Sequence, residues 1–236
     1  VMRRRKFKTI LIDPKNGRHV SAYKMIRLVL LLSRRLHKIA QQESNLGFLL
    51  PSSREGVLGF LSILSLGKTS VNLNYTSPAD VVMGCIKNAK VKTVVTSENF
   101  YEKLCQKNPN FSELKEKVKF FFIDKEENDI SKVTHFVVSL FTILSPKFLI
   151  EFCFSATKKL SDTAVILFSS GSEGVPKGIM LSHKNLIANT QQIDSVVRLK
   201  NNDVMLAELP MFHSFGVTGN ILLSLLDGIP MVLCPD

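Results

Sequence analysis

Residues 169–178 combine small, hydroxylated and glycine residues with one lysine, directly after an apolar run at residues 164–168. The ten residues are Ser169-Ser170-Gly171-Ser172-Glu173-Gly174-Val175-Pro176-Lys177-Gly178. Glycines let the backbone approach phosphate oxygens closely, and consecutive N–H groups with serine hydroxyls can point at an anion. Lys177 adds a mobile positive charge. A buried strand that runs into such a loop predicts a phosphate-binding site.

The best-known loop of this kind, the Walker A loop, does not fit this sequence. It requires Gly-x-x-x-x-Gly-Lys followed by Ser or Thr. When the pattern is counted from Gly171, Pro176 stands in place of the second glycine. Gly178 then stands where Ser or Thr should hold magnesium. The sequence therefore disfavours a P-loop NTPase.

A second candidate segment follows an expected strand at residues 205–209. It reads Pro210-Met211-Phe212-His213-Ser214-Phe215-Gly216. At a strand-to-helix turn, Phe212, His213 and Phe215 could line a cleft that has an apolar wall and one polar group. A lone histidine among apolar residues is more often a packing residue, but the phosphate loop upstream favours a role in a site for His213.

Both segments resemble the adenylate-forming superfamily of acyl-CoA synthetases, acyl-acyl-carrier-protein synthetases, luciferases and adenylation domains. The loop is similar to the family pattern small-small-Gly-Ser/Thr-x-Gly-x-Pro-Lys-Gly, and the match over all ten residues makes a plain surface turn the weaker explanation. Residues 210–216 are similar to the family segment Pro-x-Phe-His-x-x-Gly. Residues 161–236 look most like the synthetase part of 2-acylglycerophosphoethanolamine acyltransferase/acyl-ACP synthetases.

The resemblance implies an ATP- and Mg²⁺-dependent reaction in two steps. A fatty acid is first converted to an acyl-adenylate with release of pyrophosphate, and the thiol of acyl carrier protein or CoA then takes the acyl group. The resemblance implies catalytic roles for Lys177 and His213. It implies nucleotide binding by Ser169, Ser170, Gly171, Ser172, Glu173, Gly174 and Lys177. It implies an acyl pocket at Phe212, Phe215 and Gly216. No residue is expected to hold a resident metal ion.

Apolar runs and helical patterns alternate along the chain, which predicts an α/β fold of mainly parallel sheets layered with helices. The resemblance implies that this is part of the N-terminal domain of an adenylate-forming enzyme. Strands are expected at residues 9–12, 46–50, 69–73, 92–96, 120–123, 164–168 and 205–209. Serines that precede helical patterns are expected to be N-caps: Ser21, Ser53, Ser77, Ser97 and Ser182.

Two stretches are harder to interpret. Residues 125–129, which are polar and charged, are expected to form a solvated loop. Residues 136–154 are apolar and aromatic without a clean period. A buried packing element is the favoured explanation for them, with an acyl-pocket wall or a partner surface as alternatives.

The whole chain, residues 1–236, is expected to be part of one large AMP-binding domain. Residues 1–160 would form its first half with a basic head, and residues 161–236 would carry the phosphate loop and the acyl-pocket segment. The resemblance implies that the small C-terminal lid domain, whose lysine drives adenylation, is absent. The isolated chain is therefore expected to be inactive.

The positive charge is concentrated at the amino terminus. Residues 1–40 hold twelve lysines and arginines and one acid, Asp13, so that they account for the whole net charge of +11. A helix over residues 22–40 with one buried face is favoured, and contact of residues 3–38 with an anionic membrane surface is the alternative. No nucleic-acid partner is expected, because no recognised binding motif accompanies the charges. A cytoplasmic protein, or one peripheral to the inner face of the membrane, is expected.

A non-catalytic membrane-surface or interaction module remains the rival function. In that case the glycine–serine loop would bind an anionic headgroup or simply turn. The cysteines and histidines favour neither function. The four cysteines form no Cys-x-x-Cys pair, which indicates free thiols, and the five histidines lack metal-ligand spacing.

Overall fold

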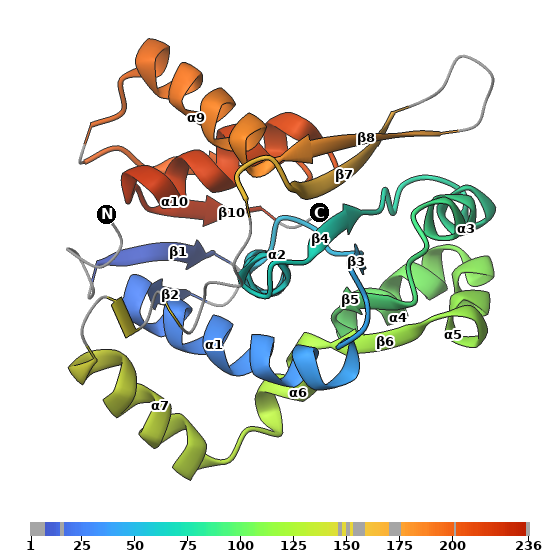
Figure 1. Ribbon diagram of the computed structural model, residues 1–236, viewed down its shortest axis with the longest axis horizontal. Coiled ribbons are helices and arrows are strands. Elements are labelled where there is room, and N and C mark those ends of the chain that lie inside the picture. The colour runs from blue at the N-terminus through green and yellow to red at the C-terminus, as the bar shows by residue number, and fades with distance from the viewer. Residues whose placement is uncertain are drawn as a thin grey trace.

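The larger of two sheets forms the centre of the fold (Figure 1). The computed structural model describes residues 8–14, 17–145, 148–149, 152, 159–169, 176–200 and 202–234. The strands of this sheet, in spatial order, are β6 (Lys119–Phe122), β5 (Thr93–Thr96), β3 (Asn45–Phe48), β4 (Thr69–Asn72), β7 (Thr163–Ser169) and β8 (Lys177–Ser182). Neighbours are parallel except β7 and β8, which form an antiparallel hairpin. The predicted α/β class with mainly parallel sheets is confirmed.

The smaller sheet joins the two ends of the chain. Its strands, in spatial order, are β2 (Arg18–Ser21), β1 (Thr9–Asp13), β10 (Met231–Leu233) and β9 (Met205–Ala207). β1 pairs antiparallel with β2 and parallel with β10. Each sheet thus contains strands from both sides of residue 160, and the division of the domain at that residue remains a prediction.

Helices cover both faces of the larger sheet. The helical elements are α1 (Ala22–Ile39), α2 (Arg54–Ser65), α3 (Ala79–Asn88), α4 (Glu98–Lys107), η1 (Pro109–Glu113), α5 (Leu114–Lys117), α6 (Ile123–Asn128), α7 (Lys132–Leu144), α9 (His183–Val197), η2 (Gly216–Leu222) and α10 (Leu223–Asp227). Successive strand residues point to opposite faces. Val95 accordingly packs in the cluster of α1 and α2, whereas Val94 packs in that of α3 and α4.

Four of the five predicted serine caps are confirmed. The side chains of Ser21, Ser53, Ser97 and Ser182 each accept a hydrogen bond from the backbone N–H three residues on, which satisfies a donor that the helix leaves free. The prediction for Ser77 was wrong. Helix α3 begins at Ala79 with Pro78 as its N-cap residue, and no side chain caps it.

Two local predictions near the amino half were also wrong. Strand β2 was not predicted. It is stabilised by pairing with β1, and its one buried apolar side chain, Val20, gives too weak a pattern in the sequence. Residues 125–129 are mostly helical and not a loop, since they lie largely within α6. Contacts with distant residues hold that helix, because Glu126 pairs with Arg35 of α1 and Glu127 with Arg54 of α2.

The basic helix α1 packs against the domain, which confirms the favoured interpretation of it. It buries residues along its inner side, including Met25, Leu28 and Leu32, whereas Ile39 at its carboxyl end is 38% exposed. Its basic side is partly occupied by the protein itself, since Arg27 donates to the Ser139 hydroxyl at 2.8 Å. No helix of the described residues is long and apolar enough to cross a membrane.

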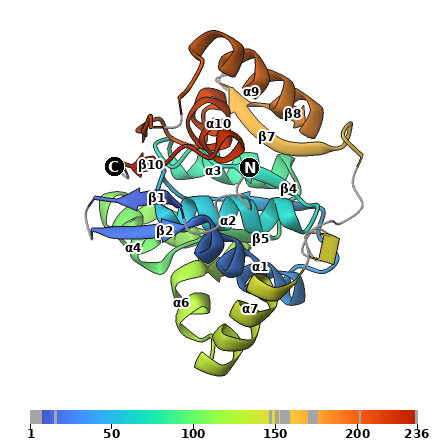
Figure 2. The same ribbon diagram turned by 90° about the vertical axis from the view of Figure 1, so that its left-hand side faces the viewer.

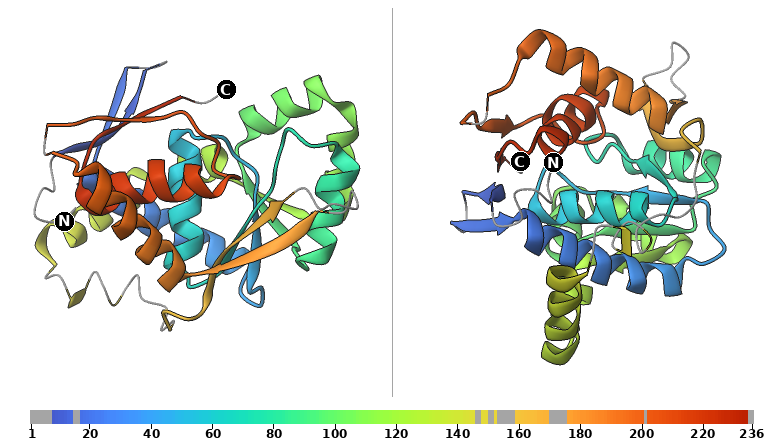
Figure 3. Two further views of the ribbon diagram at one scale, coloured as in Figure 1. Left: turned by 90° about the horizontal axis from the view of Figure 1, so that it is seen from above. Right: turned by 60° about the vertical axis from the view of Figure 1, so that its left-hand side comes forward.

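The apolar stretch at residues 136–154 does not form the expected buried element in its described part. Residues 136–144 belong to α7, which projects from the body below α1 (Figures 1 and 3). Of the thirteen residues of this helix, only Val138 and Thr142 are buried. Phe148, Leu149 and Phe152 are exposed as well. The rest of the stretch after residue 145, including Cys153, lies outside the described residues. The other three cysteines, Cys85, Cys105 and Cys234, are free thiols.

The ion pair of Arg54 is expected to be the most sensitive electrostatic contact of the fold. Its side chain is 8% exposed and donates to both carboxylate oxygens of Glu127, at 2.9 and 2.6 Å. Arg54→Met leaves a partly buried carboxylate without its partner and should lower the free energy of unfolding by about 3 kcal/mol. Arg35→Met, at a pair that is 35% exposed, should cost less than about 1 kcal/mol. Urea denaturation measures both; equal losses would contradict the expectation.

Asp227, at the end of α10, is expected to make the fold less stable at neutral pH. Burial, and then the neighbouring carboxylate of Asp194 on α9, raise the pKa of Asp227 above its ordinary value of 3.8. A raised pKa means that the folded state binds the proton more tightly than the unfolded state does. Protonation of Asp227 therefore favours the folded state at low pH, and this contribution to stability is lost as the pH rises through the folded pKa. Asp227→Asn should therefore raise the unfolding temperature at about pH 7 and have little effect at about pH 3. Asp194→Asn should act in the same direction, and an equal gain at both pH values would contradict the assignment.

Candidate functional site

The β7–β8 hairpin carries the predicted phosphate loop. Ser169, the last residue of β7, pairs with Lys177, the first residue of β8, and both are exposed. The predicted loop residues between them, Ser170, Gly171, Ser172, Glu173 and Gly174, lie outside the described residues. The hairpin therefore holds a hydroxyl and a cation opposite each other at the base of the loop.

This hairpin lies at the carboxyl edge of the larger sheet. β3, β4, β5 and β7 run parallel, so their carboxyl ends meet at one edge. In open α/β sheets, ligands bind in the crevice outside that edge. Tyr75 follows β4 by three residues, Ser97 follows β5 directly, and Ser169 ends β7. Of the expected site residues, Ser169 and its hairpin partner Lys177 thus lie at the edge where this fold class binds ligands.

Two side chains from the larger sheet's carboxyl edge hold the segment that contains Phe212 and His213. Asn72, the last residue of β4, is 1% exposed and donates from Nδ2 to the Met211 carbonyl oxygen at 2.6 Å. Ser70 donates to the Asn72 Oδ1 at 2.6 Å and fixes the amide. Ser52, which follows β3, donates to the Leu209 carbonyl oxygen at 2.7 Å. These bonds fix the backbone on either side of Pro210.

Phe212 connects this segment to the larger sheet's carboxyl edge. Its ring is 7% exposed and packs edge-on against the Tyr75 ring, with 5.0 Å between centroids. The exposed His213 ring lies 4.6 Å from the Phe212 ring. Phe212 also belongs to the same buried cluster as Ile166 of β7. Packing therefore joins His213 to the strand that leads into the predicted phosphate loop.

The other two residues of the expected acyl pocket have different environments. Phe215 is 53% exposed, and its ring covers Gly219, where an added Cβ would lie 2.8 Å from the ring. Gly216 is buried, and a Cβ on it would lie 2.1 Å from the Pro210 carbonyl oxygen. Only glycine fits there without moving the backbone of the segment. Gly216 also begins the π-helical turn η2, a feature that is frequent at functional sites.

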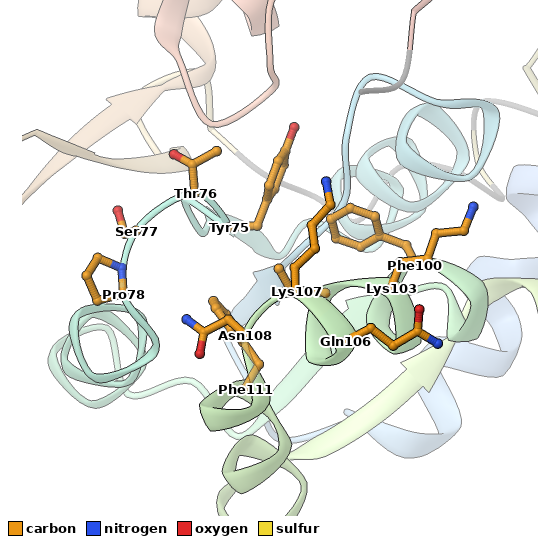
Figure 4. Close-up of a pocket in the computed structure, with 11 residues that line it drawn as sticks. Tyr75, Thr76, Ser77, Pro78, Phe100, Lys103, Gln106, Lys107, Asn108 and Phe111 are labelled. Atoms are coloured by element: carbon orange, nitrogen blue, oxygen red, sulfur yellow. The ribbon is translucent and has the colours of Figure 1, made fainter.

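A cavity of about 660 Å³ opens on the other side of Tyr75 (Figure 4). Tyr75 and Phe100 supply aromatic rings with centroids 5.1 Å apart. Lys103 and Lys107, one turn apart on α4, supply two positive charges. Figure 4 shows the remaining polar groups at the rim, including Gln106 and Asn108. The cavity thus combines apolar walls with cations, which suits an anionic ligand that carries an aromatic or apolar part.

Sequence reasoning missed this cavity. Nothing in the sequence marked Phe100 as the neighbour of Tyr75. Lys103 and Lys107 are spaced by four residues, a pattern that is usual on a solvated helix face. Among the described residues, no group of His, Cys, Asp or Glu could hold a metal ion.

The profile of the family described as "AMP-binding enzyme" matches residues 1–236. The chain belongs to this family. Among curated relatives, Arabidopsis thaliana 4-coumarate--CoA ligase 4 is 27% identical over 96% of this chain and 40% of its own length. Nicotiana tabacum 4-coumarate--CoA ligase 2 is 30% identical over 84% and 35%. The chain therefore spans less than half the length of these AMP-binding relatives.

Solved structures share the fold over nearly the whole chain. The o-succinylbenzoate CoA synthetase MenE from Bacillus subtilis, solved with a product analogue, superposes with a TM-score of 0.77 at 17% identity, over 98% of this chain and 42% of MenE. MatB from Rhodopseudomonas palustris gives 0.74 at 17% identity, over 98% and 43%. MenE has also been solved in complex with ATP and magnesium ion. At such identities these structures support the fold alone.

The Asn72 amide is expected to hold the Phe212–His213 segment in place. Asn72→Ala removes its bonds to Met211 and Ser70 and should lower the free energy of unfolding by about 2 kcal/mol. The backbone amides of residues 211–217 should lose hydrogen-exchange protection more than the rest of the chain. Asn74→Ala is the control, because among the described residues the Asn74 side chain accepts only from Thr76 in its own turn. Unchanged protection in Asn72→Ala would contradict this role.

Proposed function

We propose that this chain provides the phosphate-binding part of an ATP-dependent ligase that converts a carboxylic acid to a CoA thioester. The observation that carries the proposal is the family match over residues 1–236, together with the meeting of Ser169, Lys177 and the Phe212–His213 pair at one sheet edge. The names of the curated relatives, which are CoA ligases, agree with it.

In the first step, a carboxylate oxygen of the acid attacks the α-phosphorus of ATP. The new bond between this oxygen and the α-phosphorus gives the acyl-adenylate, while the bond between the α-phosphorus and pyrophosphate breaks and pyrophosphate leaves with its charge. The protein's part is positioning and neutralisation. Lys177 and the Ser169 hydroxyl, at the base of the loop, would contact the departing phosphates together with the loop serines Ser170 and Ser172. Magnesium would enter bound to the phosphates of ATP, where it neutralises their charge.

In the second step, a thiol attacks the acyl carbonyl, and AMP leaves. We propose CoA as the thiol carrier, because the cavity beside Tyr75 offers Lys103 and Lys107 for phosphates and two aromatic rings for an adenine base. A carrier-protein arm lacks the nucleotide and would leave these groups unused. Carrier protein remains the alternative that the sequence resemblance favours.

The acid is proposed to be apolar in its non-reacting part. Phe212 and Phe215 lie on the same segment as His213, and the exposed half of Phe215 offers apolar surface. A fatty acid and an aromatic acid such as 4-coumarate both satisfy this requirement. The first comes from the sequence resemblance and the second from the names of the relatives.

Acid-dependent exchange of labelled pyrophosphate into ATP tests the first step, with a long-chain fatty acid and 4-coumarate as substrates, in the protein as expressed from its native gene. Lys177→Ala should lower the exchange rate about 100-fold, the usual effect of losing one group that stabilises transition-state charge. Lys184→Ala, at an exposed lysine near the start of α9, is the control. Wild-type exchange in Lys177→Ala, or no exchange with either acid, would contradict the proposal.

Replacing both cavity lysines tests the acceptor. Lys103→Ala with Lys107→Ala should raise the KM for CoA about tenfold, since each exposed charge contributes about 0.7 kcal/mol. Pyrophosphate exchange should not change, because the first step does not involve the thiol. Lys87→Ala with Lys92→Ala is the matched control on the exposed surface. An equal rise in KM for pantetheine, which lacks the nucleotide, would contradict phosphate recognition at this cavity.

A further inference from the structure

Helix α7 exposes a continuous apolar stripe. The exposed side chains recur at intervals of three and four residues, so they share one side of the helix. The members of this stripe, hereafter the α7 stripe, are Val133 (71% exposed), Phe136 (68%), Val137 (56%), Leu140 (48%) and Leu144 (70%). Five large apolar side chains on one projecting helix form an exposed patch of the kind that marks an interaction surface.

Contacts on the opposite side of α7 fix the direction of the stripe. Val138 packs in a small buried cluster with Leu30 and Leu31 of α1. Tyr23 donates its hydroxyl to the Ser139 carbonyl oxygen at 2.8 Å, and Arg27 donates to the Ser139 hydroxyl at 2.8 Å. The helix cannot turn its stripe inward without breaking these contacts. The stripe therefore faces outward as a consequence of the fold.

Positive charge accompanies the stripe. α7 contains no acidic residue, and Lys132 at its first position is exposed. On α1, Lys24, Arg34 and Lys38 are exposed and share a helical face with Arg27, the residue that bonds to α7. The acids that lie nearest in sequence are paired within the domain: Glu126 and Asp129 with Arg35, and Glu127 with Arg54.

We propose that α7 docks this protein on an anionic lipid surface. The α7 stripe enters the boundary between headgroups and acyl chains, while Lys132 and the α1 cations contact the headgroups. An apolar stripe beside basic residues is the pattern of helices that lie in the membrane interface. The thirteen residues of α7 are too few to span a bilayer, which takes about 20. A second copy placed face to face would bring the same cations together, which disfavours it as the occupant.

The absence of tryptophan from the sequence gives a direct test. Phe136→Trp places a single tryptophan in the α7 stripe, and Val196→Trp places one at an 81% exposed position on α9, at the other end of the molecule (Figures 1 and 2). With vesicles of phosphatidylcholine and phosphatidylserine, the tryptophan emission of the Phe136→Trp variant should move to shorter wavelength and be quenched by brominated acyl chains. The emission of the Val196→Trp variant should not change.

Cosedimentation with the same vesicles tests which residues drive binding. Phe136→Glu with Leu140→Glu should weaken vesicle binding about tenfold or more, because two apolar side chains no longer leave water. Leu160→Glu with Val196→Glu adds the same charges at exposed apolar positions outside α7 and should bind as the wild type does. Arg34→Gln with Lys38→Gln should weaken binding and reduce its dependence on salt, whereas Lys87→Gln with Lys92→Gln should not.

Three results would overturn the proposal. The first is equal binding of the wild type to vesicles of pure phosphatidylcholine, because the charges would then play no part. The second is a short-wavelength emission of the Phe136→Trp variant without vesicles that disappears on dilution, because a second copy would then cover the stripe. The third is unchanged vesicle binding in Phe136→Glu with Leu140→Glu, with circular dichroism showing that the variant is folded.

Discussion

The hydrogen bond from the Asn72 amide to the Met211 carbonyl oxygen joins parts of the chain that lie 139 positions apart. It is buried, and the Ser70 hydroxyl fixes the amide that makes it. A buried carbonyl that lost this donor would carry the full cost of its desolvation, so the segment around Phe212 has one favourable position. The contact between Tyr75 and Phe212, and with it the place of His213, depends on that position.

Local chemistry explains which parts of the fold could be predicted. Ser53 and Ser97 cap helices because their side chains bond to N–H groups three residues on, and such a signal is readable from sequence alone. The strand at residues 164–168 could be predicted as well, because a short apolar run before a glycine-rich stretch marks a buried strand. The loop after it lies mostly outside the described residues and stays a prediction. Strand β2 and helix α6 were not, because pairing with β1 and ion pairs with Arg35 and Arg54 stabilise them across long separations.

The candidate site shows the same limit. The sequence singled out Ser169, Lys177 and His213 by their motifs but did not bring Tyr75 to Phe212. That contact depends on tertiary structure, in which Asn72 at the end of β4 holds the Met211 carbonyl oxygen and the two rings pack together. The prediction that residues 136–154 are buried was wrong for α7, and for the opposite reason. Its composition favoured burial, and in the fold six of its large apolar side chains are exposed: Val133, Phe136, Val137, Leu140, Ile143 and Leu144. A place where composition and burial disagree is where an interaction surface is to be sought.

An anionic surface that attracts α1 and α7 would also repel ATP and CoA, which are anions. The repulsion decays over a Debye length of about 8 Å at physiological salt. In Figures 1 and 2 the β7–β8 hairpin and α7 lie toward opposite ends of the molecule, with α1 between them. One helix layer alone is about 10 Å thick. On the proposed function, the β7–β8 hairpin, which would contact the phosphates of ATP, therefore lies beyond the range of the lipid charge, while an apolar acid dissolved in the same membrane would be concentrated beside the protein. Docking through α7 would thus favour access of the apolar substrate without excluding the two anionic ones.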